Sequence, residues 1–181
     1  MGNIVFASAF NVAVAAAFGG MLVVNAYAET PQTFKATIGG VSFESDDDSI
    51  RFVPLLPSSS MFTFGGTSKG GGAWPLPGAH ADRLVIVCEG FAGKPLKLTM
   101  KEFTNEICDV TFTNGVNFAV ALTGADYFLD KANPDNVFEI VTVKGNVVEG
   151  VFSFVLKAKS SGIRLPVVNG RFKAEDRLPL R

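Results

Sequence analysis

The sequence predicts an all-β domain, either an antiparallel β-sandwich or a closed, barrel-like sheet of about ten short strands, preceded by an apolar leader helix. Three observations indicate this class. After residue 28, short runs rich in Phe, Val, Thr and Ile are separated by Gly, Asn and Pro. Several of these runs alternate apolar and polar residues, as strands with one buried face do. No segment in this part has the period of a three-turn helix, which a βαβ fold would need between its strands.

The first 28 residues have the character of a leader. They contain no Asp, Glu, Lys or Arg, and they end on Ala26-Tyr27-Ala28, whose small first and third residues suit a signal peptidase. We therefore predict a signal peptide at 1–28 and a single exported domain at 29–181, in the periplasm or outside the cell. Two alternatives stay open. Residues 4–24 could be an uncleaved membrane anchor, since about 20 apolar residues span a bilayer, or a buried helix of the domain.

Charge is almost balanced along the chain, with 16 Lys and Arg residues against 17 Asp and Glu residues. A nucleic-acid partner is not expected, because it would require a basic face. The hydrophobic fraction is 48%, raised in part by the leader. The remainder is sufficient for one soluble domain with a sizeable core.

Two hairpins are predicted from paired turn residues, because glycine and asparagine accept the positive φ of a tight turn. The strands are 34–38 and 41–43 around Gly39-Gly40, and 138–143 and 147–159 around Gly145-Asn146. A closing strand, Leu165–Phe172, follows Ser160-Ser161-Gly162. In the middle of the chain, 83–89 and 95–101 alternate as half-buried strands.

A third hairpin is predicted at Asn114-Gly115, between strands 108–113 and 116–122. A two-residue loop would place Phe112 and Phe118 on opposite faces. A three-residue loop places them on the same face, so we expect a type I turn with a glycine bulge at Gly115.

Residues 54–80 are rich in Pro, Ser and Gly, and they are expected to form a long mobile loop with one strand at Met61–Phe64. The single tryptophan, Trp74, is a candidate stacking platform for a sugar ring or a partner side chain, or else an anchor of the loop on the core. The single histidine, His80, is a second candidate ligand-binding residue. A water-exposed loop histidine is the more ordinary interpretation, since no nucleophile-elbow motif accompanies it.

Asp46, Asp47 and Asp48 are the candidate metal ligands. Hard cations bind several oxygen atoms, so consecutive carboxylates could hold calcium. The spacing is not that of an EF-hand, and a solvated turn explains it equally well. No other cofactor is expected, because one histidine and two cysteines do not assemble a usual zinc site.

Cys88 and Cys108 are a candidate disulfide if the chain is exported, and the closed loop would stabilise the domain by about 3 kcal/mol. If strands 83–89, 95–101 and 108–113 form a simple meander, a third strand separates the cysteines by about 10 Å, which is too far. A bridge requires their strands to be adjacent or to face each other.

The chain resembles a group of small exported β-sheet domains of unknown function found in bacterial envelope proteins and lipoproteins. The matching residues open and close the domain: F-K-A-T-I-G-G-V-S-F (Phe34–Phe43), G-V-F-S-F (Gly150–Phe154) and N-G-R-F (Asn169–Phe172). The resemblance implies an antiparallel β fold and an envelope location, and it provides no catalytic residues. This chain departs from the lipoprotein members because it lacks the cysteine that carries the lipid.

No motif in the sequence specifies a chemistry. We therefore expect a non-enzymatic binding or structural domain, with an envelope protein, a glycan or an apolar ligand as partner and membrane contact only through an uncleaved leader. One alternative is a hydrolase that uses carboxylates from separate strands, such as Glu44, Glu89 or Glu139. Another is a small barrel with an apolar ligand cavity, suggested by the 17 Phe residues.

Overall fold

The computed structural model describes residues 31–68, 80–117 and 125–177, with eleven strands and two short helical segments. The strands are β1 (Thr33–Ile38), β2 (Val41–Glu44), β3 (Arg51–Pro54), β4 (Phe62–Thr67), β5 (His80–Cys88), β6 (Leu96–Thr99), β7 (Cys108–Asn117), β8 (Tyr127–Leu129), β9 (Val137–Lys144), β10 (Val147–Ala158) and β11 (Arg164–Glu175). The helical segments are η1 (Asp47–Ser49) and α1 (Met100–Thr104). The predicted leader lies outside the described residues.

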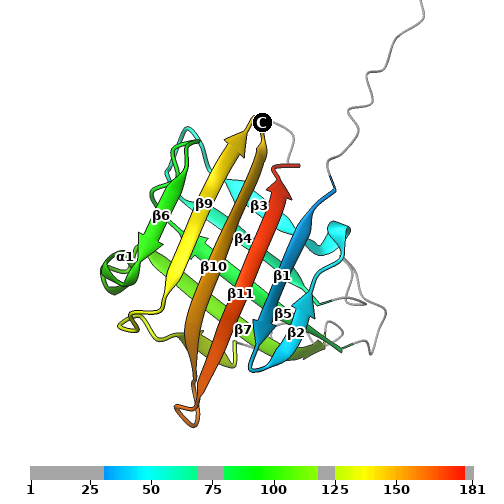
Figure 1. The fold of residues 1–181 in the computed structure, drawn as a ribbon, viewed down its shortest axis with the longest axis vertical. Coiled ribbons are helices and arrows are strands. Elements are labelled where there is room, and N and C mark those ends of the chain that lie inside the picture. The colour runs from blue at the N-terminus through cyan, green and yellow to red at the C-terminus, as the bar shows by residue number, and fades with distance from the viewer. Residues whose placement is uncertain (1–30, 69–79, 118–124, 178–181) are drawn as a thin grey trace, which may run out of the picture.

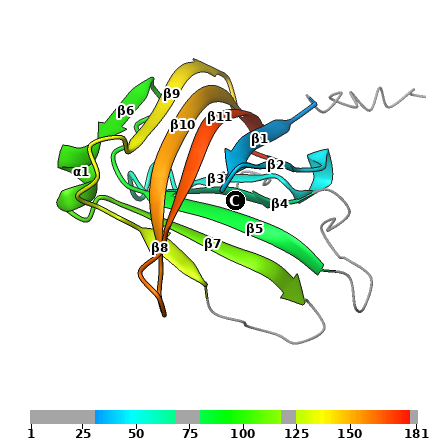
Figure 2. The same cartoon turned by 60° about the horizontal axis from the view of Figure 1, so that its bottom comes forward.

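All eleven strands belong to one sheet, and every pairing is antiparallel. The path runs β2-β1-β11-β10-β8-β7-β5-β4-β3, with β9 beside β10 and β6 beside β9. Strand β10 is 12 residues long and pairs with β9 over its first part and with β8 at its end. The sheet folds over at this point, so that β6, β9, β10, β11, β1 and β2 cover β3, β4, β5 and β7 (Figures 1 and 2).

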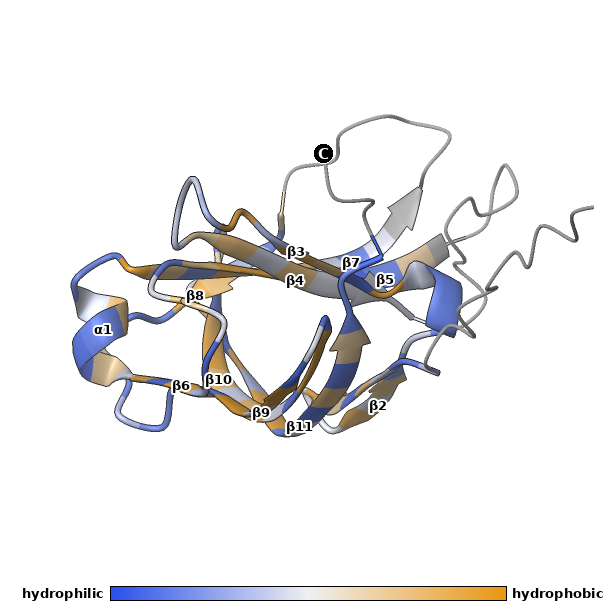
Figure 3. Cartoon of the chain, turned by 90° about the horizontal axis from the view of Figure 1, so that it is seen from above, coloured by the Kyte–Doolittle hydropathy of each residue, from blue (hydrophilic) through white to orange (hydrophobic). Residues whose placement is uncertain are grey.

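The prediction of an antiparallel all-β domain is confirmed, and the architecture is a curled half-barrel. Its two layers are parts of one continuous sheet, joined through β10 and β8. The ends of the sheet path are β2 and β3, which follow each other in the chain through η1. Seen from above, both layers carry hydrophobic segments (Figure 3).

Phenylalanine rings fill the space between the layers. Phe34, Phe64 and Phe138 have no exposed surface. The ring centroids of Phe34 and Phe64 are 4.7 Å apart, and those of Phe64 and Phe172 are 4.5 Å apart. Phe138 stacks on Phe172 at 5.4 Å with an interplanar angle of 8°. Burial of this apolar surface is the main stabilising term of the fold, because each ring removes a large area from water.

The two glycine hairpins are confirmed. Gly39 and Gly40 have φ of 58° and 86°, so they form the tight turn between β1 and β2, where Ile38 faces Val41. Gly145, with φ of 61°, begins the turn between β9 and β10. One face of β10 is apolar, and its members are buried: Val148, Phe152, Phe154 and Leu156.

Two glycines in β10 and β11 each lie opposite a phenylalanine of the other strand. Gly150 faces Phe172, and Phe152 faces Gly170. A Cβ at Gly150 would lie 2.5 Å from the Phe172 ring, and one at Gly170 would lie 2.4 Å from the Phe152 ring. Glycine is therefore required for close packing at both positions. This reciprocal arrangement explains why G-V-F-S-F and N-G-R-F occur together in the sequence.

The hairpin predicted at Asn114-Gly115 is wrong. Strand β7 continues through these residues to Asn117, and it pairs with β5. The register shifts where Arg83 faces Thr113 and Ala81 faces Val116, so Asn114 and Gly115 form a bulge opposite Asp82. The glycine does adopt the positive φ (63°) expected of a bulge, but within a paired strand and not at a turn.

Strands 83–89, 95–101 and 108–113 do not form a meander, because β5 and β7 are neighbours and β6 pairs with β9. The strand predicted to reach Lys101 ends at Thr99, which is the N-cap residue of α1. The Glu102 carboxylate accepts hydrogen bonds from the Thr99 backbone N–H (2.9 Å) and from its hydroxyl (2.8 Å), as in a capping box. This local capping ends the strand.

Within the predicted loop 54–80, a strand is confirmed near Met61–Phe64, but β4 runs from Phe62 to Thr67 and includes Gly65-Gly66. These glycines lie in the strand because side chains there would collide with the neighbours. A Cβ at Gly65 would lie 2.5 Å from the Leu84 carbonyl oxygen, and one at Gly66 would lie 2.9 Å from the Phe34 ring.

Candidate functional site

The Asp46–Asp48 turn is bound to residues that flank β1 and β11. The Asp47 carboxylate accepts hydrogen bonds from the Gln32 backbone N–H (2.6 Å) and from the Arg177 guanidinium (3.1 and 3.2 Å). The Gln32 side chain donates to the Asp47 carbonyl oxygen and accepts from the Glu175 N–H. Asp47 thus joins η1 to the start of β1 and to the residues after β11. Within the described segments, no three His, Cys, Asp or Glu side chains converge as a metal site would require.

The carboxylates considered for hydrolysis lie on separate strands. Glu44 on β2 pairs with Lys35 (2.7 Å), and Glu139 on β9 pairs with Lys97 (3.0 Å). In each case the two residues face each other on adjacent strands, so these are cross-strand ion pairs on the outer surface. Glu89 is exposed just after β5. A glycosidase pair would instead need two carboxyl groups about 5–10 Å apart across a cleft.

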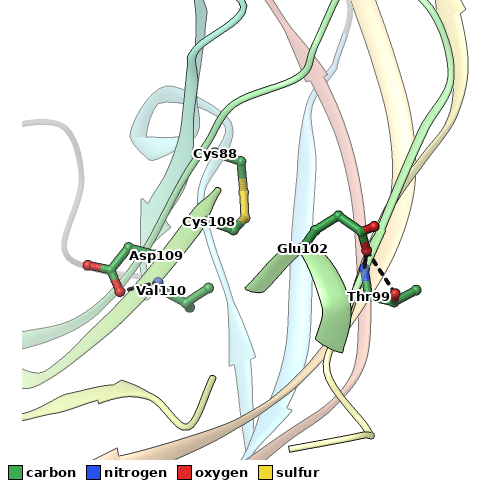
Figure 4. Close-up of a disulfide and its surroundings, with 6 residues drawn as sticks. All are labelled: Cys88, Thr99, Glu102, Cys108, Asp109 and Val110. Atoms are coloured by element: carbon green, nitrogen blue, oxygen red, sulfur yellow. Dashed lines mark hydrogen bonds between the residues drawn. A yellow bond between two sulfur atoms is a disulfide. The ribbon is translucent and has the colours of Figure 1, made fainter. Parts of the chain in front are cut away.

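Cys88 and Cys108 are directly opposite each other at the ends of β5 and β7, with Cα atoms 4.1 Å apart, and form a disulfide (Figure 4). Both are buried in the core. The bridge closes the segment that contains β6 and α1.

Trp74 lies outside the described residues. His80 begins β5 and faces Asn117, so its backbone belongs to a strand and not to the predicted loop.

An apolar pocket of about 240 Å³ opens at the end of the half-barrel where β10 begins and β11 finishes. Figure 1 shows this end, opposite the β10–β11 hairpin. The lining comes from β3, the segment between β3 and β4, the segment after β5, the β9–β10 hairpin and the residue that follows β11: Phe52, Pro54, Leu56, Phe91, Gly93, Val143, Gly145, Asn146, Val148 and Asp176.

The floor of this pocket is part of the phenylalanine core. The rings of Phe52 and Phe91 meet edge to face at 5.7 Å, and Phe62 lies 5.8 Å behind Phe91. Phe52 and Phe91 are almost fully buried, whereas Leu56 on the outer side is 44% exposed. The pocket lining therefore includes one exposed leucine and two buried aromatic rings.

One wall of the pocket is held in place by hydrogen bonds. The Asn146 side-chain amide donates to the Glu175 carboxylate (3.1 Å) and to the Asp176 carbonyl oxygen (3.2 Å). The Asp176 N–H donates to the Asn146 carbonyl oxygen (2.9 Å). The β9–β10 turn is thus fastened to the end of β11. On the other side, the Phe91 N–H donates to the Ser60 carbonyl oxygen (3.0 Å).

The arrangement can bind an apolar group, and Asp176 provides the one carboxylate among its lining residues. The 17 Phe residues suggested an apolar cavity but not its location, because Phe52, Phe91 and Val148 come from distant segments. Leu55-Leu56, an apolar pair in a Pro- and Ser-rich stretch, was the one local signal. Within the described residues, both helical segments are too short to serve as a membrane span.

No protein-family model matches the chain, and neither a curated protein nor a solved structure matches it. The described residues form an antiparallel half-barrel with an apolar pocket at one end.

Proposed function

We propose that the protein is a non-enzymatic binding domain of the cell envelope or the exterior, and that its pocket takes an aromatic group. The observation that carries this proposal is the pocket itself, where Phe52 and Phe91 reach a surface opening at the end of a densely packed core. An apolar cavity of about 150 Å³ is large enough to bind benzene. A pocket of about 240 Å³ therefore suits one or two fused rings.

Export is part of this proposal. The uncharged apolar segment before Glu29, the A-Y-A cleavage pattern and the resemblance to exported envelope domains support it. A buried disulfide between Cys88 and Cys108 is consistent with an oxidising compartment. The mass of the mature protein tests cleavage after Ala28: a chain that begins at Glu29 is expected, and an intact leader would indicate the anchored form.

Fluorescence titration with N-phenyl-1-naphthylamine tests the binding function, since this uncharged probe carries a naphthalene group, joined through N–H to a phenyl ring, and brightens in apolar surroundings. We expect a saturable increase with the wild-type protein. Val143→Phe should fill the pocket and weaken binding at least tenfold, because Val143 lines it. The matched control is Val141→Phe, on the same strand, 50% exposed and outside the pocket.

Circular dichroism and thermal melting must show that both variants are folded. The proposal fails if the wild-type protein gives no saturable signal. It also fails if the two variants bind the probe equally well, because binding would then occur elsewhere on the molecule.

A further inference from the structure

The other end of the half-barrel carries two adjoining depressions of about 300 and 460 Å³. They lie at the far ends of the strands that line the apolar pocket: β10 runs from Val148 at that pocket to Ala158 here. Both depressions are lined by Tyr127 and Asn114, so Tyr127 forms the ridge between them. Their sizes fall within the range of small-molecule sites, about 300–1,000 Å³.

The β7 bulge fixes two carboxylates beside this ridge. The Asn114 N–H donates to Asp126 Oδ2 (2.9 Å), and the next amide, that of Gly115, donates to Asp82 Oδ1 (3.0 Å). The two carboxylates are thus bound to consecutive amides of the bulge, with Asp82 lining one depression and Asp126 the other. Each has a second oxygen atom that accepts no hydrogen bond from the described residues.

Tyr127 supplies an aromatic surface between these polar groups. Its ring packs on Phe112 with centroids 5.9 Å apart, and the side chain is half-buried. Its hydroxyl and the side-chain amide of Asn114 have no hydrogen-bond partner among the described residues. The site therefore combines one ring face with donors and acceptors that are not satisfied within the described fold.

We infer that these two depressions form a binding site for a neutral saccharide of two or three rings, lying across Tyr127. A sugar ring has an apolar C–H face, which suits Tyr127, and hydroxyl groups, which suit the carboxylates and the Asn114 amide. Among the lining residues, the two carboxylates of Asp82 and Asp126 outnumber the single ammonium group of Lys159, so the net charge is negative and does not favour phosphate or sulfate groups. This inference does not rest on the apolar pocket, which lies at the opposite end of β10.

An NMR titration of the ¹⁵N-labelled protein with maltose, cellobiose and N,N′-diacetylchitobiose tests the inference. We expect at least one disaccharide to cause saturable shifts at millimolar concentration in the amides of Asn114, Gly115 and Tyr127. Tyr127→Ala should weaken binding at least tenfold. Tyr127→Phe should retain the stacking surface and weaken binding only a few-fold. This variant keeps an aromatic ring on β8, so it tests the site even if the alanine variant fails to fold.

The matched control is Val168→Ala on β11, where the side chain is 42% exposed and lines neither depression. It should leave the affinity unchanged. The inference is overturned if none of the three disaccharides causes saturable shifts, or if Tyr127→Ala binds them as well as the wild type. A response to glucosamine alone would also overturn it, because the carboxylates would then be binding a cation.

Discussion

Some positions in this fold are packed so closely that only glycine fits, and Gly170 is the clearest case. Its Cα lies against the Phe152 ring, so a methyl group would overlap both the ring and the backbone. Gly170→Ala should therefore lower the free energy of unfolding by about 1–3 kcal/mol, as overpacking does. Urea denaturation measures the change. In a Phe152→Leu background the same substitution should cost less, and an equal cost in both backgrounds would contradict the ring contact as its cause.

Asp47 joins η1 to residues that flank β1 and β11. Its carboxylate accepts hydrogen bonds from Gln32 and Arg177, so Asp47→Ala should lower the free energy of unfolding by about 1–2 kcal/mol. Asp48→Ala, at an exposed neighbouring position, should leave stability nearly unchanged. Calcium should not raise the Tm of the wild-type protein. A rise in Tm that Asp48→Ala removes would contradict this account and would indicate a calcium site at Asp46–Asp48.

At the scale of elements, the disulfide fastens β5 to β7 and encloses β6 and α1, with a sequence separation of 20. Replacing both cysteines by alanine should lower the free energy of unfolding by about 3 kcal/mol, because the unfolded chain regains the freedom of that loop. Urea denaturation with and without dithiothreitol measures it. The reductant should destabilise the wild type by a similar amount and leave the double variant unaffected; equal stability of the reduced and oxidised wild type would contradict the prediction.

Helix α1 should make stability depend on pH. The backbone N–H and hydroxyl of Thr99 hold the pKa of Glu102 below its ordinary value. A lowered pKa in the folded state stabilises the protein at pH above the ordinary carboxyl range, and this contribution is lost as pH falls through the folded-state pKa. Glu102→Gln should therefore lower Tm slightly at neutral pH and leave it unchanged once the wild-type carboxyl is protonated. A constant difference in Tm across a pH 2–7 melting series (roughly the span in which carboxyls titrate) would contradict this.

The elements that could be predicted from the sequence are those defined by nearby residues. The turns at Gly39-Gly40 and Gly145-Asn146 follow from positive φ at adjacent positions, and alternation marks β5 and β10. Pairing between distant strands carries no comparable local signal. The sequence therefore suggested a local hairpin at Asn114-Gly115, where the structure has a bulge opposite β5. Strand β8 is only three residues long, too short for alternation to mark it. Neither the strand nor the position of Tyr127 could therefore be predicted.

The positions of the candidate sites could not be predicted either, because they too depend on contacts between distant segments. Each lies where the curled sheet brings distant segments together: Phe52, Phe91 and Val148 at one end, Asp82, Asn114 and Tyr127 at the other. Residues that are unusual in the sequence, such as Trp74, attract attention, whereas ordinary phenylalanines and aspartates line the observed depressions. Function on such a fold depends on the curvature of the sheet, which is set by long-range packing.

At the scale of the whole molecule, the phenylalanine core couples the two layers and therefore supports both ends. Phe138 on β9 contacts Phe62 and Phe64 of the opposite layer, and it stacks on Phe172 of its own layer. Phe138→Ala should remove about 3–5 kcal/mol from the free energy of unfolding, through lost burial and the cavity left behind. Because all strands belong to one sheet around one core, the loss should appear in a single cooperative transition.

Urea titration followed by far-UV circular dichroism and by tyrosine NMR signals tests this cooperativity. The matched control is Val151→Ala on the adjacent strand β10, where the side chain is 39% exposed and the cost should stay below about 0.5 kcal/mol. Coincident midpoints for both probes in the Phe138 variant are expected. If the β7–β8 end, reported by Tyr127, unfolded separately from the rest, the half-barrel would consist of two independently stable parts, and the phenylalanine core would not be the link between them.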